Sequence, residues 1–267
     1  MNTLTIRQET PADYKQVELL AMRAFWNIHG PGCNEHLLVR KIRQSKDYLP
    51  QLSRVAELDG KIVGAIYYAK GKVADGETTH EVITFGPLAV EPTLQNSGVG
   101  SALLKNTISL AKEAGYPGIV ITGEPEYYPR LGFATCDKFG ITDAEGENFA
   151  ALMCLPLDEK RFSSIRGKYI ESPVYNECNG PEELKQFQAE FPLYRKVKLK
   201  EGFLMLLDKR LGVIKAIDQD TYYIKFWELT IPAKLSADLN KDQVKPKAGN
   251  DVLFLWKREG LSEITSI

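Results

Sequence analysis

The segment 81–122 constrains the fold most, because it has the pattern of strand, loop, helix and strand. An apolar stretch leads into a loop that ends in Gly98 and Gly100. Apolar residues then recur at helical spacing over about 98–114, and the short run 118–122 is rich in β-branched residues. Two consecutive strands joined by a helix lie parallel in one sheet. We therefore predict a parallel crossover at the centre of the chain.

A second signal predicts antiparallel strands in the same sheet. Two strand-like runs, Ser53–Leu58 and Lys61–Lys72, are joined by Asp59-Gly60, which is a strong hairpin signal. The same half has further predicted elements: a strand at Leu4–Arg7, a helix after Thr10, a helix at about Asn34–Ser45 and a strand near Phe149–Leu155. We therefore predict an α/β (α+β) domain over residues 1–175, in which helices flank a mixed central sheet.

The C-terminal part has a different pattern, and its composition shifts near Ser172–Pro181. One helix is expected at about Pro181–Phe191. Strand-like runs follow at Gly202–Leu207, Leu211–Ile217, Thr221–Leu229 and Asp251–Trp256. We predict that residues 180–267 form a small accessory β-rich module with one leading helix. Short curved strands suggest an SH3-like or related barrel.

Composition excludes several classes of protein. The chain has 267 residues and a formal net charge of −1, which argues against a nucleic-acid footprint. Its four cysteines are too few for a disulfide framework and lack the spacing of metal ligands. No apolar run has the roughly 18–20 residues that a membrane helix needs, and the N-terminus lacks a signal-peptide pattern. We expect a cytoplasmic protein without a metal or a membrane partner, and an oligomer is compatible with the sequence.

The loop Gln95–Gly100 has the properties of an anion site. Glycine allows the backbone to approach a ligand closely. The first amides of a helix have no internal acceptor, and the helix dipole adds partial positive charge there. The loop lacks the lysine of a P-loop and the third glycine of the dinucleotide motif. The residues alone therefore predict a phosphate or pyrophosphate site of another kind.

Three motifs in order carry a resemblance to a known family. Gln95-x-x-Gly98-x-Gly100 resembles the acetyl-CoA motif of the GNAT (N-acetyltransferase) superfamily. The preceding run Gly86–Val90 resembles the superfamily's fourth strand, and Gly123–Phe133 resembles its tyrosine signature. The resemblance covers roughly residues 3–157 and is nearest to a branch of predicted bacterial acetyltransferases. It implies a GNAT fold with acetyl-CoA as co-substrate.

The resemblance also implies which residues hold acetyl-CoA. Backbone groups of three residues on the fourth strand would pair with the pantetheine arm: Leu88, Ala89 and Val90. Backbone amides of the loop and helix start would hold the pyrophosphate: Gln95, Asn96, Ser97, Gly98, Val99, Gly100 and Ser101.

Tyr128 aligns with the tyrosine that serves as the acid for the leaving thiolate in the family. A phenol has a reference pKa near 10, so it stays protonated at neutral pH and can donate a proton. Tyr127 is the alternative if the short helix is rotated. The sequence departs from many relatives in one place, because Ile121 stands seven residues before Tyr128 where they carry Asn.

The sequence does not single out one side chain as the general base. Four side chains are conceivable: Glu35, His36, Glu81 and Glu124. Family members often use a chain of water molecules instead, so no base is assigned.

The resemblance implies an enzyme that moves an acetyl group from acetyl-CoA to an amine of a small molecule or a protein, by direct attack. The acceptor cannot be deduced from the sequence. The rival interpretation is a GNAT-like sensor or scaffold that binds acyl-CoA without turnover. A second rival is a protein-modifying enzyme whose C-terminal module recognises a partner.

Overall fold

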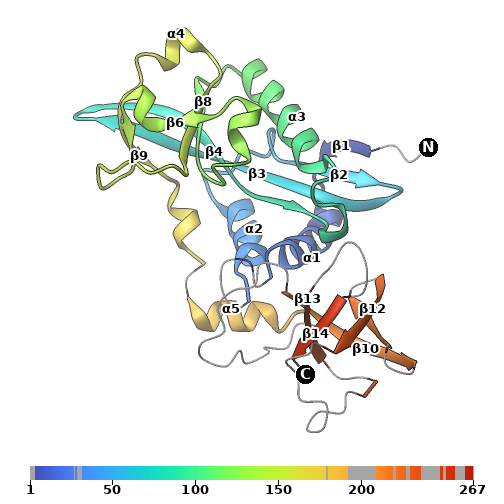
Figure 1. Cartoon of the computed structure of the whole chain (residues 1–267). Helices are drawn as coiled ribbons and strands as arrows, with labels where there is room; N and C mark the ends of the chain where they lie inside the picture. Colours follow the sequence, from blue (N-terminus) through green and yellow to red (C-terminus); the bar gives the residue numbers. More distant parts are fainter. Residues whose placement is uncertain are drawn as a thin grey trace. The chain divides into compact units, whose positions relative to one another are not determined.

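The computed structural model divides the chain into two compact units (Figure 1). It describes residues 4–26, 28, 32–178, 180–191, 209–218, 221–226, 229–235, 247–248, 251–255 and 262–266. The first unit takes residues 1–24 and 34–184, and the second takes 25–33 and 185–267. The sequence-based boundaries at 175 and 180 stay a prediction.

A nine-stranded sheet forms the core of the first unit, with the order β1-β2-β3-β4-β5-β8-β6 along its main path. These strands are β1 (Leu4–Gln8), β2 (Arg54–Leu58), β3 (Lys61–Asp75), β4 (Thr78–Val90), β5 (Gly118–Thr122), β6 (Ala134–Thr135) and β8 (Leu152–Pro156). Two further strands lie off this path: β7 (Ile141–Thr142) pairs with β9 (Gly167–Ile170), which also pairs with β3. The β4–β5 pair is parallel and the β2–β3 and β3–β4 pairs are antiparallel, which confirms the predicted mixed sheet.

Helices cover both faces of this sheet. They are α1 (Tyr14–Phe25), α2 (Glu35–Gln44), α3 (Val99–Glu113) and α4 (Glu159–Phe162), with short 3-10 turns at Pro11–Asp13, Pro92–Leu94, Tyr128–Leu131, Cys136–Phe139 and Pro173–Asn176. Adjacent residues of β3 show which helix lies on which face. The Tyr67 hydroxyl accepts a hydrogen bond from Arg43 of α2, whereas the Tyr68 hydroxyl is bonded to Thr107 of α3. Neighbouring side chains of a strand point to opposite faces, so α2 and α3 lie on opposite sides of the sheet, as Figure 1 shows.

A buried ionic cluster holds α1 and α2 together. Arg43 of α2 contacts Glu9 Oε1 at 2.6 Å and Glu18 Oε1 at 3.0 Å, and these three side chains are at most 6% exposed. The Arg43 guanidinium also lies 4.1 Å from the centre of the Tyr14 ring. Buried charges are tolerated only when they are paired and hydrogen-bonded, so this cluster fixes the two helices relative to each other.

Gly64 of β3 sets how closely α3 packs on the sheet. A Cβ at this position would lie 2.8 Å from Leu103 Cδ1 and 2.9 Å from Val99 Cγ1. Only glycine therefore allows the first turns of α3 to approach β3 this closely. Since α3 begins at Val99, the same contact positions the loop before it.

We expect Gly64→Ala to lower the free energy of unfolding by about 1–3 kcal/mol, because it overpacks a buried interface. Urea titration measures this loss. Leu103→Ala alone should cost about 2–5 kcal/mol through the cavity that it leaves. The new methyl group fills part of that cavity, so the double variant should lose less than the sum of the two. Strict additivity would contradict this account of the α3 contact.

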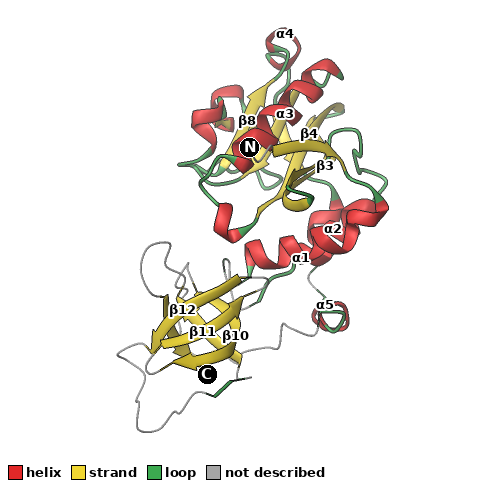
Figure 2. Cartoon of the chain, turned by 90° about the vertical axis from the view of Figure 1, so that its right-hand side faces the viewer, coloured by secondary structure: helices red, strands yellow, loops and turns green. Residues whose placement is uncertain are grey.

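The second unit contains strands that close into a barrel with the order β10-β11-β12-β14-β13 (Figure 2). They are β10 (Lys209–Asp218), β11 (Thr221–Phe226), β12 (Leu229–Leu235), β13 (Asp251–Leu255) and β14 (Ser262–Ser266). The predicted β-rich character is confirmed, whereas the likeness to an SH3 barrel stays a prediction. The predicted leading helix is α5 (Pro181–Gln188), which contains the boundary between the two units.

Two of the strands predicted for this unit are not confirmed. The predicted strand Gly202–Leu207 lies outside the described residues. The predicted strand Thr221–Leu229 is wrong at its end, because β11 stops at Phe226 and a new strand, β12, begins at Leu229.

Candidate active site

β4 and β5 diverge at the centre of the sheet. The two parallel strands are in register at Ile83 and Ile119, and the described pairing between them goes no further. On its other side β4 stays paired with β3, with Ile66 opposite Leu88 and Gly64 opposite Val90. The last third of β4 therefore has one paired edge and one open edge. An open strand edge presents backbone donors and acceptors to a ligand.

A bulge in β4 turns its end toward α3. Ile66 lies opposite Leu88 and Tyr68 opposite Phe85, so Gly86 and Pro87 together face the single residue Tyr67. Such an extra residue reverses which face the following side chains occupy. Phe85 belongs to the core on the α3 side, and after the bulge Leu88 and Val90 pack against that same core.

The start of α3 lies beside this part of β4. A Cβ on Gly100 would lie 3.4 Å from Val90 Cγ2 and 3.8 Å from Leu88 Cδ2. Gly98 is the N-cap residue, with φ of 99°, and its carbonyl accepts the first helical hydrogen bond from Ala102 at 2.9 Å. A glycine cap has no side chain to bond the amides of the first turn, which stay available to an anion.

The seven predicted loop amides divide into two groups. The Gln95 amide donates to Pro92 O at 3.4 Å, and the Ser97 amide donates to Leu94 O at 3.2 Å. These two bonds shape the loop, and Gln95 Nε2 also donates to Val90 O at 3.3 Å. Within the described part of the chain, no backbone acceptor is found for the other five amides, which belong to Asn96, Gly98, Val99, Gly100 and Ser101. These five are the better anion donors.

Tyr128 lies in an aromatic cluster next to the gap between β4 and β5. Its ring centre is 5.7 Å from that of Phe85 and 5.5 Å from that of Phe133. Burial, with smaller effects from Tyr127 and Glu124, raises the pKa of Tyr128 to about 12. Gly123 makes room for this ring, because a Cβ there would lie 2.4 Å from Tyr128 Cε2. The Tyr128 phenol is therefore held in place and stays protonated.

Tyr127 lies at the helix start instead. Its hydroxyl is 3.0 Å from Ser101 Oγ, and Arg130 lies 4.3 Å from the centre of its ring. The two rings are 5.0 Å apart and nearly perpendicular. Both tyrosines thus border the same site, with Tyr127 on the side of the loop and Tyr128 on the side of β4.

Ile121 occupies the position at which many GNAT relatives carry an asparagine. Its side chain is 2% exposed and packs in the core beneath α3, in the same cluster as Phe85 and Phe133. An apolar side chain suits this environment, so the position has a packing role in this chain.

Of the four candidate bases, one is buried, two are bonded to other groups and one is exposed. His36 is fully buried, and burial together with Arg40 lowers its pKa to about 3. Glu35 accepts a hydrogen bond from the Asn34 amide at 3.1 Å, and Glu81 forms an exposed ion pair with Lys70 at 2.9 Å. The Glu124 side chain is exposed.

β9 and the segment after it contact β3 and the β4 bulge, and sequence reasoning missed them. The Tyr175 hydroxyl donates to Gly86 O at 3.5 Å, and Tyr169 lies across Gly71, where a Cβ would be 3.0 Å from its ring. A signal was present, because an isolated glycine inside a strand often marks a close approach of another group. Gly71 and Gly86 are such positions.

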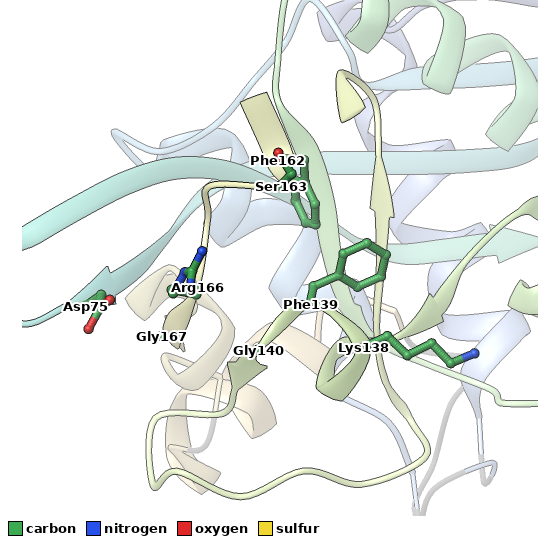
Figure 3. A pocket seen from close by; sticks show the side chains of 8 residues that line it. All are labelled: Asp75, Lys138, Phe139, Gly140, Phe162, Ser163, Arg166 and Gly167. Atoms are coloured by element: carbon green, nitrogen blue, oxygen red, sulfur yellow. The ribbon is translucent and has the colours of Figure 1, made fainter. Parts of the chain in front are cut away.

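A separate hollow of about 570 Å³ lies where β7 and β9 meet (Figure 3). It is lined by Asp75, Lys138, Phe139, Gly140, Phe162, Ser163, Arg166 and Gly167. The Phe139 and Phe162 rings pack edge to face at 5.4 Å, while the Lys138 side chain extends away from the other labelled groups (Figure 3). This hollow includes none of the predicted site residues.

The described residues contain no cluster of three or more His, Cys, Asp or Glu side chains suited to a metal ion. No helix in the described ranges is both long enough and apolar enough to cross a membrane.

Comparison with known proteins agrees with the geometry. Residues 51–135 match the family model of the acetyltransferase (GNAT) domain. The N-acetyltransferase YjhQ of Escherichia coli K12 is 31% identical over 99 residues, which are 37% of this chain and 55% of YjhQ. The N-acetyltransferase YhbS of the same strain is 29% identical over 131 residues, which are 49% of this chain and 73% of YhbS. The chain thus matches little more than half the length of YjhQ.

Two solved structures share the fold of the first unit. The structure of Escherichia coli YhbS in complex with CoA superposes with a TM-score of 0.59 at 22% identity, covering 66% of this chain and 94% of YhbS. A GNAT acetyltransferase from Brucella melitensis in complex with acetyl-CoA gives a TM-score of 0.53 at 24% identity, covering 66% of this chain and 99% of that protein. Residues 51–135 are thus similar to a GNAT acetyltransferase domain, and the chain shares its fold with solved GNAT acetyltransferases.

Proposed function

We propose that the protein transfers the acetyl group of acetyl-CoA to an amine by direct attack of the amine on the thioester. The observation that carries this proposal is the open edge of β4 beside the unbonded amides at the start of α3. One of these features accepts an extended chain and the other accepts an anion. Acetyl-CoA contains an extended chain and an anion, namely its pantetheine arm and its pyrophosphate.

The residues at these two features suit this co-substrate. Leu88, Ala89 and Val90 would pair with the pantetheine arm, because the bulge has set their strand edge beside α3. The amides of Asn96, Gly98, Val99, Gly100 and Ser101 would hold the pyrophosphate, while Gln95 and Ser97 would keep the loop in shape. Space for the anion is supported by Gly98, where a Cβ would meet nothing within 4 Å.

Tyr128 would serve as the acid for the leaving thiolate. Its raised pKa keeps the phenol protonated, and its packing against Phe85 and Phe133 fixes where the proton is delivered. Tyr127 is the alternative acid, since its hydroxyl lies at the helix start. Acetyl-CoA supplies the activated acyl group, and the side chains of this protein bind it, exclude water and move protons.

A thiol-release assay tests the proposal against the rival of a sensor without turnover. We expect acetyl-CoA to bind saturably in calorimetry. We also expect CoA thiol to appear at a rate that depends on the concentration of at least one amine. The panel should include alkylamines, polyamines and peptide α-amines, with the matching alcohols as controls. Tight binding with no amine-dependent thiol release would favour the sensor.

A further inference from the structure

A half-buried carboxylate lies beside the β4 bulge, on the face away from α3. Glu171 connects β9 to the 3-10 turn Pro173–Asn176. Its backbone position is fixed on one side by the pairing of Ile170 with Lys72 of β3. On the other side the buried Ser172 donates a hydrogen bond to Asp47 Oδ2 at 2.8 Å. Glu171 is thus held on a rigid part of the fold.

Two tyrosines flank this carboxylate and connect it to the bulge. The chain reverses after Glu171, with the Tyr175 amide donating to Ser172 O at 3.2 Å, and the Tyr175 hydroxyl then reaches Gly86 O. Burial raises the pKa of both Tyr169 and Tyr175, and the nearby Glu171 charge raises it further in each case. The carboxylate therefore lies close to both phenols.

The Tyr169 hydroxyl points to a ligand at this position. Tyr169 is 5% exposed, and its hydroxyl has no hydrogen-bond partner among the described residues. The Thr84 hydroxyl is near enough to lower the pKa of this phenol, yet it does not form a hydrogen bond of ordinary geometry. An unpaired buried hydroxyl costs about 1–3 kcal/mol, so its retention calls for an explanation such as a bound group.

The face of the sheet also suits an acceptor. Phe85 points toward α3 and the cofactor loop, so Thr84 and Gly86 point to the opposite face of β4. Tyr169, Glu171 and Tyr175 gather on that face, next to the open strand edge. An acceptor held there would meet the thioester from the side opposite the pyrophosphate loop.

We infer that Glu171 receives the acceptor as a protonated primary amine between Tyr169 and Tyr175, and takes the proton that must leave before attack. This inference rests on the proposed acetyl transfer and names the substrate class of that same site. Aromatic walls and one carboxylate suit an alkylammonium group, which gains from both the charge and the ring faces.

The proton balance is complete with the groups named. Glu171 takes one proton from the ammonium, and the neutral nitrogen forms a C–N bond with the thioester carbonyl carbon. The C–S bond breaks, and Tyr128 gives its proton to the departing sulfur. The second nitrogen proton returns to Tyr128, and Glu171 releases its proton to solvent. The products are the acetylated amine, CoA thiol and one proton.

The pKa of the Glu171 carboxyl suits a group that takes a proton from the amine. Burial raises its pKa to about 7, and the groups that face it are the neutral phenols of Tyr169 and Tyr175. Burial is the cause of this shift, and the Asp47 carboxylate accepts a hydrogen bond from the neighbouring Ser172. A base is most effective when its pKa lies near the working pH.

Glu171→Gln tests the inference, with propylamine, spermidine and the dipeptide Ala-Tyr as acceptor probes. We expect kcat to fall about 100- to 10,000-fold, the usual contribution of a positioned base, while calorimetric affinity for acetyl-CoA is unchanged. The wild-type kcat should rise with pH to a plateau with a midpoint near 7. In the variant it should keep rising toward the pKa of the free amine, about 10. Glu171→Asp should restore part of the rate and the plateau.

Glu177→Gln is the matched control, because Glu177 is exposed and lies just after the same turn. It should keep both the rate and the pH profile. An unchanged kcat and plateau in Glu171→Gln would overturn the inference. A variant whose KM for the amine rises while kcat and the plateau persist would also overturn the proton-transfer role.

A measurement without turnover separates this inference from the proposed function. The infrared carboxyl band, taken as wild type minus Glu171→Gln, should titrate with a midpoint near pH 7. A midpoint below 5 would overturn the inference even if acetyl transfer is observed. If the band titrates as expected but no probe is acetylated, the proposed function fails and Glu171 is left as a proton-binding group of a sensor.

Discussion

Gly98→Glu is expected to abolish acetyl-CoA binding. Gly98 caps α3 with φ of 99°, and a Cβ there would meet nothing within 4 Å, so the new carboxylate would extend into the space assigned to the pyrophosphate. Like charges about 4 Å apart near a protein surface repel by about 4 kcal/mol, and each 1.4 kcal/mol is tenfold. We therefore expect Kd to rise by at least about 100-fold in calorimetry.

Two control variants separate the effect of the new charge on acetyl-CoA affinity from the effect of backbone strain at a glycine with positive φ. Gly76 also has positive φ, of 58°, and an open Cβ direction, but it lies in the turn between β3 and β4. Gly76→Glu should cost similar stability and leave acetyl-CoA affinity unchanged. Gly98→Ala carries the strain without the charge and should weaken binding far less than Gly98→Glu. Retained binding by Gly98→Glu would refute the placement of the pyrophosphate.

Tyr128→Phe is expected to lower kcat by about 100-fold or more, because it removes the acid and keeps the ring. Packing against Phe85 and Phe133 involves the ring alone, so thermal stability should be nearly unchanged. Acetyl-CoA affinity should also persist. Since the pKa of Tyr128 is raised to about 12, the wild-type rate should show no loss from its ionisation below about pH 11. Steady-state kinetics and calorimetry together measure these effects.

Tyr127→Phe is the matched comparison, since it removes the hydroxyl of the neighbouring tyrosine. That hydroxyl is 3.0 Å from Ser101 Oγ, and a hydrogen bond of this kind contributes about 0.5–1.5 kcal/mol. We expect this variant to change acetyl-CoA affinity modestly and to keep kcat. The reverse pattern, with kcat lost in Tyr127→Phe and kept in Tyr128→Phe, would assign the acid to Tyr127.

Elements of the fold that depend on neighbouring residues, such as turns and helix starts, could be predicted from the sequence. The Asp59-Gly60 turn predicted the β2–β3 hairpin and Gly98 predicted the start of α3, because each conformation needs those residues. The order of elements through Thr122 followed from the change between strand and helix periodicity.

Features that depend on distant contacts could not be predicted in the same way. The bulge at Gly86-Pro87 is visible only in the register between β3 and β4. Glu171 follows a strand of four residues, Gly167–Ile170, which is too short to show alternation, and the Gly86 bulge that Tyr175 contacts is far from it in the sequence. The loop at Gln95–Gly100 could therefore be proposed as a cofactor site from local signals, whereas the face around Glu171 could not be singled out.

The pairing of β9 with the outer end of β3 has a consequence for how such enzymes diversify. The residues proposed to bind the cofactor lie between Leu88 and Ser101, whereas the segment that contacts the bulge from the other face comes from Gly167–Asn176. The two halves of the site are thus encoded in separate stretches of the gene. On these assignments, substitutions in the later stretch would change acceptor choice while the residues proposed to bind the acetyl donor stay the same.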